Sequence, residues 1–122
     1  MHQSVVALRV LVVEDEMLVA MLIEDYLCEM GHEVVGPMLR IETAIQAARS
    51  LEIDFGVLDI NLAGEQSFPV ADELRSRGIG FMFASGYGAS GLPDRFDGIP
   101  VLQKPFEALQ LERLISSVRE NR

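Results

Sequence analysis

Residues 55–62 have the sequence Phe-Gly-Val-Leu-Asp-Ile-Asn-Leu, a short apolar run that stops at one acidic residue, Asp59. Polar and glycine-containing sequence follows, with Asn61, Gly64 and Glu65. An apolar run of about four to eight residues bounded by turn signals is typical of a strand buried on both faces of a parallel sheet. Ligands of open α/β sheets bind just beyond the carboxyl ends of such strands. We therefore expect Asp59 at the edge of a binding site, although a lone Asp in this position more often caps a local turn.

Composition favours one globular domain. The chain has 122 residues, 49% of them hydrophobic, which is enough for a packed core and argues against disorder. No apolar stretch reaches the ~18 residues of a membrane span, and the first residues, Met1 to Ser4, lack the basic start of a secretory peptide. The single cysteine, Cys28, excludes an internal disulfide, fits a cytoplasmic protein and is expected to be a small core residue.

The chain is acidic, with 19 acidic and 10 basic residues and a net charge of −9. This charge opposes binding to nucleic acid and to anionic membranes, so neither is expected as a partner. Part of the acidity is available for a cation site, and the rest is expected on the solvated surface.

Strands and helices are predicted to alternate along the chain. The expected strands are residues 8–13, 33–38, 54–59, 79–84 and 100–102, and the expected helices are 17–30, 43–51, 67–77 and 106–119. Core positions are also predicted. The leucines and methionines at helical spacing in the first helix are expected in the core, as are Leu109 in the last helix and three phenylalanines, Phe81, Phe83 and Phe106. Residues 86–98 are poor in helix formers. Alternation of this kind predicts right-handed βαβ units and a parallel sheet with helices on both faces. No linker or repeat is present, so residues 1–122 are predicted to form a single domain.

Polar side chains follow four of these strands, and the carboxyl ends of parallel strands meet at one edge of the sheet. Carboxylates at such an edge repel one another unless their pKa values rise or a cation binds, and oxygen ligands of this kind suit Mg²⁺. A hydroxyl and a lysine at the same edge suit a phosphoryl group. The pattern therefore predicts an aspartate nucleophile that accepts a phosphoryl group with metal assistance. The residues concerned are Glu14, Asp15, Asp59, Ser85 and Lys104.

Four motifs in order carry a resemblance to a known family. They are V-L-V-V-E-D-E at 10–16, V-L-D-I-N-L at 57–62, F-A-S-G-Y at 83–87 and K-P-F at 104–106. Over nearly its whole length the chain resembles the receiver domain of bacterial two-component response regulators. The resemblance implies the CheY-like form of the flavodoxin-like fold, a doubly wound five-stranded parallel sheet of order 2-1-3-4-5 with helices on both faces.

The resemblance also implies roles for individual residues. Asp59 would be the phosphoacceptor, Lys104 would contact the phosphoryl group, and Ser85 would be the switch hydroxyl. The peptide bond between Lys104 and Pro105 would be cis. The ligands implied for Mg²⁺ are Glu14, Asp15, Asp59 and the backbone carbonyl of Asn61.

Two positions depart from the best-known receivers. Val101 stands three residues before Lys104, where an aromatic that moves on activation is usual, and Tyr87 stands two residues after Ser85. Tyr87 and its neighbours resemble a subgroup named for the signature F-A-T-G-Y, whose members are often partnered with kinases of the HWE and related classes. We therefore expect activation to disorder or repack residues 86–98, with Tyr87, rather than residue 101, as the moving aromatic.

The implied function is that of a receiver without an output domain, which catalyses only its own phosphorylation and dephosphorylation. Its donor would be a histidine kinase or a histidine phosphotransfer protein. Its output would be contact with a downstream protein or withdrawal of phosphate from a shared kinase.

Three alternatives are open on the sequence alone. A haloacid-dehalogenase-like phosphatase also has a strand-end Asp nucleophile, but it needs a second Asp where this chain has Asn61. A nucleotide hydrolase needs a G-x-x-x-x-G-K-[ST] loop, which is absent. The third is an interaction module that works without phosphorylation, against which the presence of Asp59, Ser85 and Lys104 argues.

Overall fold

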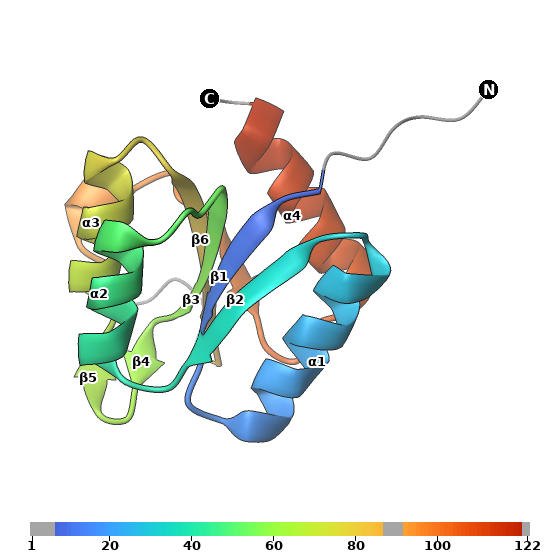
Figure 1. Ribbon diagram of the computed structural model, residues 1–122, viewed down its shortest axis with the longest axis horizontal. Helices are drawn as coiled ribbons and strands as arrows, with labels where there is room; N and C mark the ends of the chain where they lie inside the picture. The colour runs from blue at the N-terminus through green and yellow to red at the C-terminus, as the bar shows by residue number, and fades with distance from the viewer. Residues whose placement is uncertain (1–6, 87–91, 121–122) are drawn as a thin grey trace.

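The computed structural model describes residues 7–86 and 92–120. In this part of the chain strands and helices alternate as the sequence predicts (Figure 1). In chain order the elements are β1 (Arg9–Val13), α1 (Met17–Glu29), β2 (Glu33–Met38), α2 (Ile41–Ser50), β3 (Phe55–Asp59), β4 (Asn61–Leu62), β5 (Glu65–Gln66), α3 (Phe68–Ser76), β6 (Gly80–Ser85), the 3₁₀ turn η1 (Asp94–Phe96), β7 (Val101–Gln103) and α4 (Ala108–Glu120).

The main sheet has five parallel strands in the order β2-β1-β3-β6-β7. Counted by the strands of this sheet alone, the order is 2-1-3-4-5, so the predicted flavodoxin-like topology is confirmed. Strand β3 lies at the centre, and all five of its residues are buried. Asp59 is the last of them, which places it at the carboxyl edge of the sheet.

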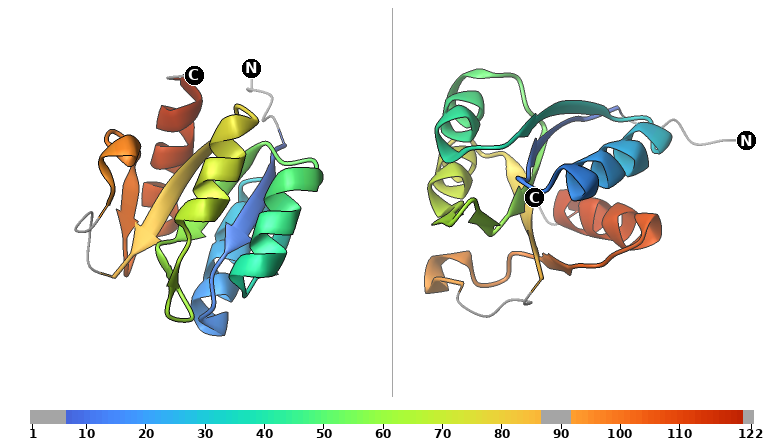
Figure 2. Two further views of the ribbon diagram at one scale, coloured as in Figure 1. Left: turned by 90° about the vertical axis from the view of Figure 1, so that its left-hand side faces the viewer. Right: turned by 90° about the horizontal axis from the view of Figure 1, so that it is seen from below.

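Helices cover both faces of the sheet, with α1 and α4 on one side and α2 and α3 on the other (Figures 1 and 2). Successive side chains of a strand point to opposite faces, so each buried strand contributes to two cores. In β1, Leu11 and Val13 pack in the core under α2 and α3, whereas Val10 and Val12 pack in the core under α1 and α4. This double burial explains why the strands are continuous apolar runs in the sequence.

Gly56 in β3 permits close packing of α3 on the sheet. A Cβ atom at this position would lie 2.6 Å from Cδ1 of Leu74 on α3. The missing side chain lets Leu74, which has no exposed surface, reach the strand. The centre of the sheet is thereby packed closely against α3.

The segment after β3 differs from the prediction, whereas the segment between β6 and β7 agrees with it. A short hairpin, β4–β5, follows β3, and its turn places Ala63 at φ 51° and Gly64 at φ 86°. Strands of two residues have no periodicity to detect, and only the glycine signalled a turn. Between β6 and β7 the described residues contain only η1, in agreement with the low helix propensity of this segment.

Phe96 anchors that segment to the body of the protein. Its side chain has no exposed surface, and its ring centroid lies 5.3 Å from that of Phe83 and 5.6 Å from that of Phe68. Next to it, Arg95 forms a two-bond ion pair with Asp72 of α3. Residues 94–96 are therefore fixed against β6 and α3.

The burial predicted for several helical residues is wrong. Helix α1 buries Ala20, Ile23 and Leu27, and its first two turns expose apolar side chains that were expected in the core. The exposed apolar residues of α1, together with the exposed Cys28, are Met17, Leu18, Met21 and Leu22. Leu109 of α4 is likewise exposed, whereas the predicted core residues Phe81, Phe83 and Phe106 are buried.

The peptide bond between Lys104 and Pro105 is cis, as predicted. None of the helices in the described ranges combines the length and the apolar character that crossing a bilayer requires.

Candidate functional site

The site lies at the carboxyl edge of the sheet, where the ends of four strands bring polar residues together. Glu14 and Asp15 follow β1, Asp59 ends β3 and Ser85 ends β6. Lys104 follows β7, and its backbone N–H donates to the carbonyl oxygen of Ser85 over 2.9 Å. The parallel register that pairs Asp59 with Ala84 sets these ends side by side. The lengths and the register of the strands therefore place these polar residues at the edge of the sheet. Both properties are determined by the buried apolar runs.

Three carboxylates form a compact cluster at this edge. One oxygen each of Glu14, Asp15 and Asp59 lies within 4.8 Å of the others. The side chain of Glu14 has no exposed surface, and Asp59 is 7% exposed. A set of oxygen donors so close together matches the ligands that Mg²⁺ prefers.

Lys104 supplies positive charge to this cluster. Its Nζ atom lies 2.9 Å from Oε1 of Glu14, 3.3 Å from Oδ2 of Asp59 and 3.6 Å from Oε1 of Glu16. The Lys104 side chain is only 15% exposed. One ammonium group is thus shared by three carboxylates.

Burial shifts the titration of these groups. Desolvation raises the pKa of Glu14 to about 7, the hydrogen bond from Lys104 opposes the rise, and the charge of Asp59 adds to it. Burial also raises the pKa of Asp59, against the charge of Lys104. For Lys104, burial lowers the pKa, but the bond to Glu14 and the charges of both acids outweigh it and leave the pKa raised. Lys104 is therefore charged at neutral pH.

Backbone N–H groups fix the orientation of the carboxylates. Oδ2 of Asp15 accepts a hydrogen bond of 2.8 Å from the N–H of Ala63, in the turn of the β4–β5 hairpin. Oδ1 of Asp59 accepts from the N–H of Asn61 over 3.4 Å, and Oε2 of Glu14 accepts from the N–H of Glu16 over 3.1 Å. The hairpin that the sequence did not predict therefore holds one of the acidic residues of the site.

An open cavity of about 900 Å³ gives access to the cluster. Asp15, Asp59, Asn61, Ser85 and Lys104 all line it, so five of the six predicted site residues within the described ranges meet there. Glu14, the sixth, is buried behind Lys104. Tyr87, predicted as a switch residue, lies outside the described residues.

Glu16 was not predicted as a site residue. It lines the same cavity, and its carboxylate approaches Lys104. The sequence feature that could have identified it is the acidic triplet Glu14-Asp15-Glu16, because Glu16 directly follows two predicted site residues.

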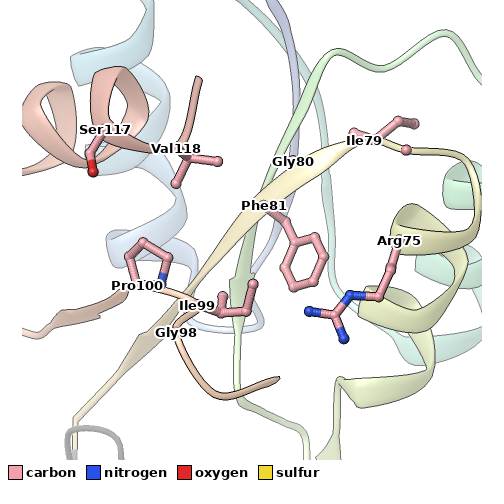
Figure 3. A pocket seen from close by; sticks show the side chains of 10 residues that line it. Arg75, Ile79, Gly80, Phe81, Gly98, Ile99, Pro100, Ser117 and Val118 are labelled. Atoms are coloured by element: carbon pink, nitrogen blue, oxygen red, sulfur yellow. The ribbon is translucent and has the colours of Figure 1, made fainter. Parts of the chain in front are cut away.

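A second cavity, of about 340 Å³, lies near the opposite end of β6 (Figure 3). It is lined mainly by apolar side chains and glycines, together with Ser117 of α4 and Arg75, whose guanidinium group points towards Phe81 (Figure 3). Carboxylates are absent from its described lining, so the metal chemistry predicted from the sequence belongs to the cavity beside Asp59.

Comparison with known proteins gives relatives over nearly the whole chain. SdrG from Sphingomonas melonis Fr1, known from a solution structure, is 37% identical, with a TM-score of 0.82 over 96% of this chain and 99% of SdrG. The chain belongs to the response regulator receiver family. No family model matches this receiver.

Two longer proteins agree with this assignment. The response regulator PhyR from Brucella abortus is 30% identical, with a TM-score of 0.77 over 93% of this receiver and 48% of PhyR. The two-component response regulator PhoP from Pseudomonas aeruginosa is 28% identical over 116 residues. The match covers 91% of the present chain but only 51%, about half, of the length of this curated relative. As a receiver domain, the protein is not an enzyme in the usual sense.

Proposed function

We propose that Asp59 accepts a phosphoryl group from a phosphohistidine partner, and that Glu14, Asp15 and Asp59, with the backbone carbonyl of Asn61, hold Mg²⁺ while it does so. The observation that carries this proposal is the position of Asp59 in the lining of the cavity, 3.3 Å from Lys104 and within the three-carboxylate cluster. A nucleophile, a cation and a set of metal ligands thus meet at one point.

The donor set of the cluster fits a hard divalent cation. All of its donor atoms are oxygens, and two of the three side chains are buried. The negative charges of the three carboxylates repel one another, and Lys104 offsets this repulsion only in part. A bound cation would reduce it further. When bound, Mg²⁺ would neutralise charge on the phosphoryl oxygens and on the cluster.

The residues of the chain have separate tasks in the transfer. A carboxylate oxygen of Asp59 attacks phosphorus, the new bond is an acyl phosphate, and the P–N bond of the donor breaks, returning its electron pair to the imidazole, which takes up a proton. The Nζ atom of Lys104 and the hydroxyl of Ser85 donate to the oxygens of the transferred group. Loss of the group by hydrolysis is a separate reaction: water attacks phosphorus, the P–O bond to Asp59 breaks, and inorganic phosphate leaves while Asp59 regains its carboxylate.

SdrG gives independent support, because a beryllofluoride-activated conformation has been solved for that protein. This second SdrG structure is 36% identical and covers 89% of the present receiver with a TM-score of 0.75. Beryllofluoride imitates a phosphoryl group on a carboxylate, and we expect the same compound to bind at Asp59.

The test is incubation with acetyl phosphate and Mg²⁺, followed by intact-mass measurement. We expect the mass of one phosphoryl group on the wild type and none on Asp59→Asn or without Mg²⁺. Asp54→Asn is a matched control, because Asp54 lies just before the other end of the same strand and accepts a hydrogen bond from Arg9. Label that persists on Asp59→Asn would place the acceptor elsewhere.

For the partners we propose a histidine kinase, of the HWE or a related class, or a histidine phosphotransfer protein as donor. Output would be contact with a downstream protein, through residues 86–98, β7 and α4, or withdrawal of phosphate from a shared kinase; residues 87–91 of that face lie outside the described residues. The net charge of −9 supports a protein partner over nucleic acid. Sequence-specific DNA binding by this chain at physiological salt would contradict the proposal.

A further inference from the structure

Glu16 lines the cavity that contains Asp59 and lies next to Lys104. It stands at the N-cap of α1, and its side chain is 67% exposed at the entrance to the cavity. It makes no side-chain capping bond to the helix, so its carboxylate is not committed to α1. Instead, Oε1 lies 3.6 Å from Nζ of Lys104.

The entrance carries an excess of negative charge. Among the described residues that line the cavity, Asp15, Glu16 and Asp59 are acidic and Lys104 is the one basic residue. A cavity lined by one sign of charge repels ions of that sign and slows their entry. A small phosphodonor is itself an anion, so each carboxylate at the entrance lowers its local concentration.

Glu16 also competes for the cation that a phosphoryl group needs. Lys104 is bound to Glu14 and Asp59 inside the site, and Glu16 occupies a further part of its coordination from the solvent side. An incoming phosphate competes with that contact for Lys104. Both effects, repulsion at the entrance and retention of Lys104, lower the rate at which a small anionic phosphodonor reacts at Asp59.

A donor carried on a protein is affected much less. Its binding free energy comes from contact between two protein surfaces away from the cavity, and this binding delivers the phosphoryl group to Asp59 at high effective concentration. Charge at the entrance therefore discriminates between free anions and a phosphohistidine presented by a protein.

We propose that Glu16 is a specificity-determining residue that disfavours small anionic phosphodonors at Asp59. The inference rests on the proposed function of Asp59 and adds the class of donor that the site favours.

The test compares rates of Asp59 labelling by acetyl phosphate at saturating Mg²⁺. Glu16→Gln keeps the length of the side chain and removes its charge, and we expect a rate about threefold to tenfold above the wild type at low ionic strength, the size of one charge acting on a nearby dianion. Glu16→Asp, which restores the charge, should return the rate towards that of the wild type. Glu29→Gln, at the far end of the same helix and exposed, makes the same change in net charge and should leave the rate unchanged.

Two further readings separate electrostatics from a change of structure. The ratio of Glu16→Gln to wild type should shrink towards one at about 0.5 M salt, where the screening length is only a few ångströms. It should also be smaller for phosphoramidate, a monoanion, than for the dianion acetyl phosphate. Neither dependence would follow from a mere repacking of the helix terminus.

The outcomes distinguish this inference from the function on which it rests. If the wild type is labelled and Glu16→Gln reacts no faster at any salt concentration, the role of Glu16 is wrong and the assignment of Asp59 stands. If no variant is labelled by either donor under any condition, the assignment of Asp59 fails and the role of Glu16 falls with it.

Discussion

The Nζ atom of Lys104 lies 2.9 Å from Oε1 of Glu14, closer than its 3.3 Å approach to Oδ2 of Asp59. The cation is thus paired most closely with a fully buried carboxylate. Burial of either charged group alone would cost free energy, and their pairing offsets part of that cost. A charged cluster placed at the carboxyl edge of the sheet therefore affects stability as well as chemistry.

The first prediction concerns pH. Glu14 has a pKa of about 7 in the folded protein and an ordinary value of 4.5, so between these values the folded state holds a proton that the unfolded state has lost. Raising the pH through this window must therefore lower the free energy of unfolding of the metal-free protein, by on the order of 3 kcal/mol, with no further loss from Glu14 above about pH 7. Asp59, whose pKa is also raised, acts in the same direction.

Urea denaturation of the metal-free protein from pH 4.5 to 8 measures this dependence. Glu14→Gln should flatten it, whereas Glu112→Gln, an exposed change on α4, should not. A wild-type stability that increases steadily between pH 5 and 7, with the same slope in Glu14→Gln, would contradict the assignment.

The second prediction concerns Lys104. Lys104→Met keeps much of the side-chain volume but leaves Glu14 and Asp59 without their cation, so we expect a loss of about 1–3 kcal/mol of stability at pH 8. At pH 5 the loss should be smaller, because Glu14 is then protonated. Denaturation at the two pH values tests this, with Lys104→Arg as the charge-retaining control. An equal loss at both pH values would mean that packing, not charge, accounts for the effect.

The sequence predicted this edge of the sheet well because it depends on buried strands. Each strand is an apolar run packed on both faces, so the end of the strand can be recognised in the sequence. Glu14, Asp59 and Lys104 were predicted as site residues because they stand at or just after such ends. Contacts that depend on one hydrogen bond from a backbone N–H group could not be predicted from the sequence. The contact of the Ala63 N–H with Asp15 depends on a two-residue turn with positive φ angles, for which Gly64 was the only signal.

Helix α1 shows a different limit of the sequence. Residues 17–23 are apolar without interruption, so two helical stripes satisfied the same periodicity. The structure buries the stripe with Ala20 and Ile23 and exposes the one with Leu18 and Met21. Which stripe faces the sheet is decided by the space beneath the helix, where the small Ala20 allows close approach, and the residue pattern alone does not contain that information.

The third prediction concerns metal binding. If the three carboxylates hold Mg²⁺, the ion should stabilise the folded protein, by about 2.7 kcal/mol at a concentration of one hundred times its dissociation constant. Asp15→Asn should reduce this stabilisation strongly, and Glu112→Gln should not. Thermal unfolding over a Mg²⁺ titration gives the measurement, and equal stabilisation of all three proteins would argue against a site at the cluster.

The fourth prediction concerns Phe96. Its buried ring contacts Phe68, Phe81 and Phe83, so Phe96→Ala should cost about 3–5 kcal/mol of stability. Leu109→Ala removes an exposed apolar side chain and should change stability by no more than about 0.5 kcal/mol. Urea denaturation at one pH compares the two variants. A small loss for Phe96→Ala would show that residues 94–96 are not anchored in solution.

The last prediction concerns how phosphorylation is transmitted. The sequence hypothesis places the change in residues 86–98, with Tyr87 as the moving aromatic, and Val101 offers no aromatic in β7 to take its place. The burial of Phe96 and the ion pair between Arg95 and Asp72 argue that residues 94–99 resist displacement. We therefore expect the response to arise in the part of the segment nearest Ser85, with Phe96 as its fixed end.

Amide hydrogen exchange with Mg²⁺, with and without beryllofluoride, tests this division. Peptides that begin at Ser85 and end before residue 94 should change their exchange, whereas the amides of Phe96, Asp97 and Ile99, which donate to local carbonyl groups, should keep theirs. Tyr87→Ala should weaken the change near Ser85 without altering labelling of Asp59. If beryllofluoride instead exposes the amides of residues 96–99, the Phe96 anchor itself is released on activation, and the moving unit is the whole connection between β6 and β7.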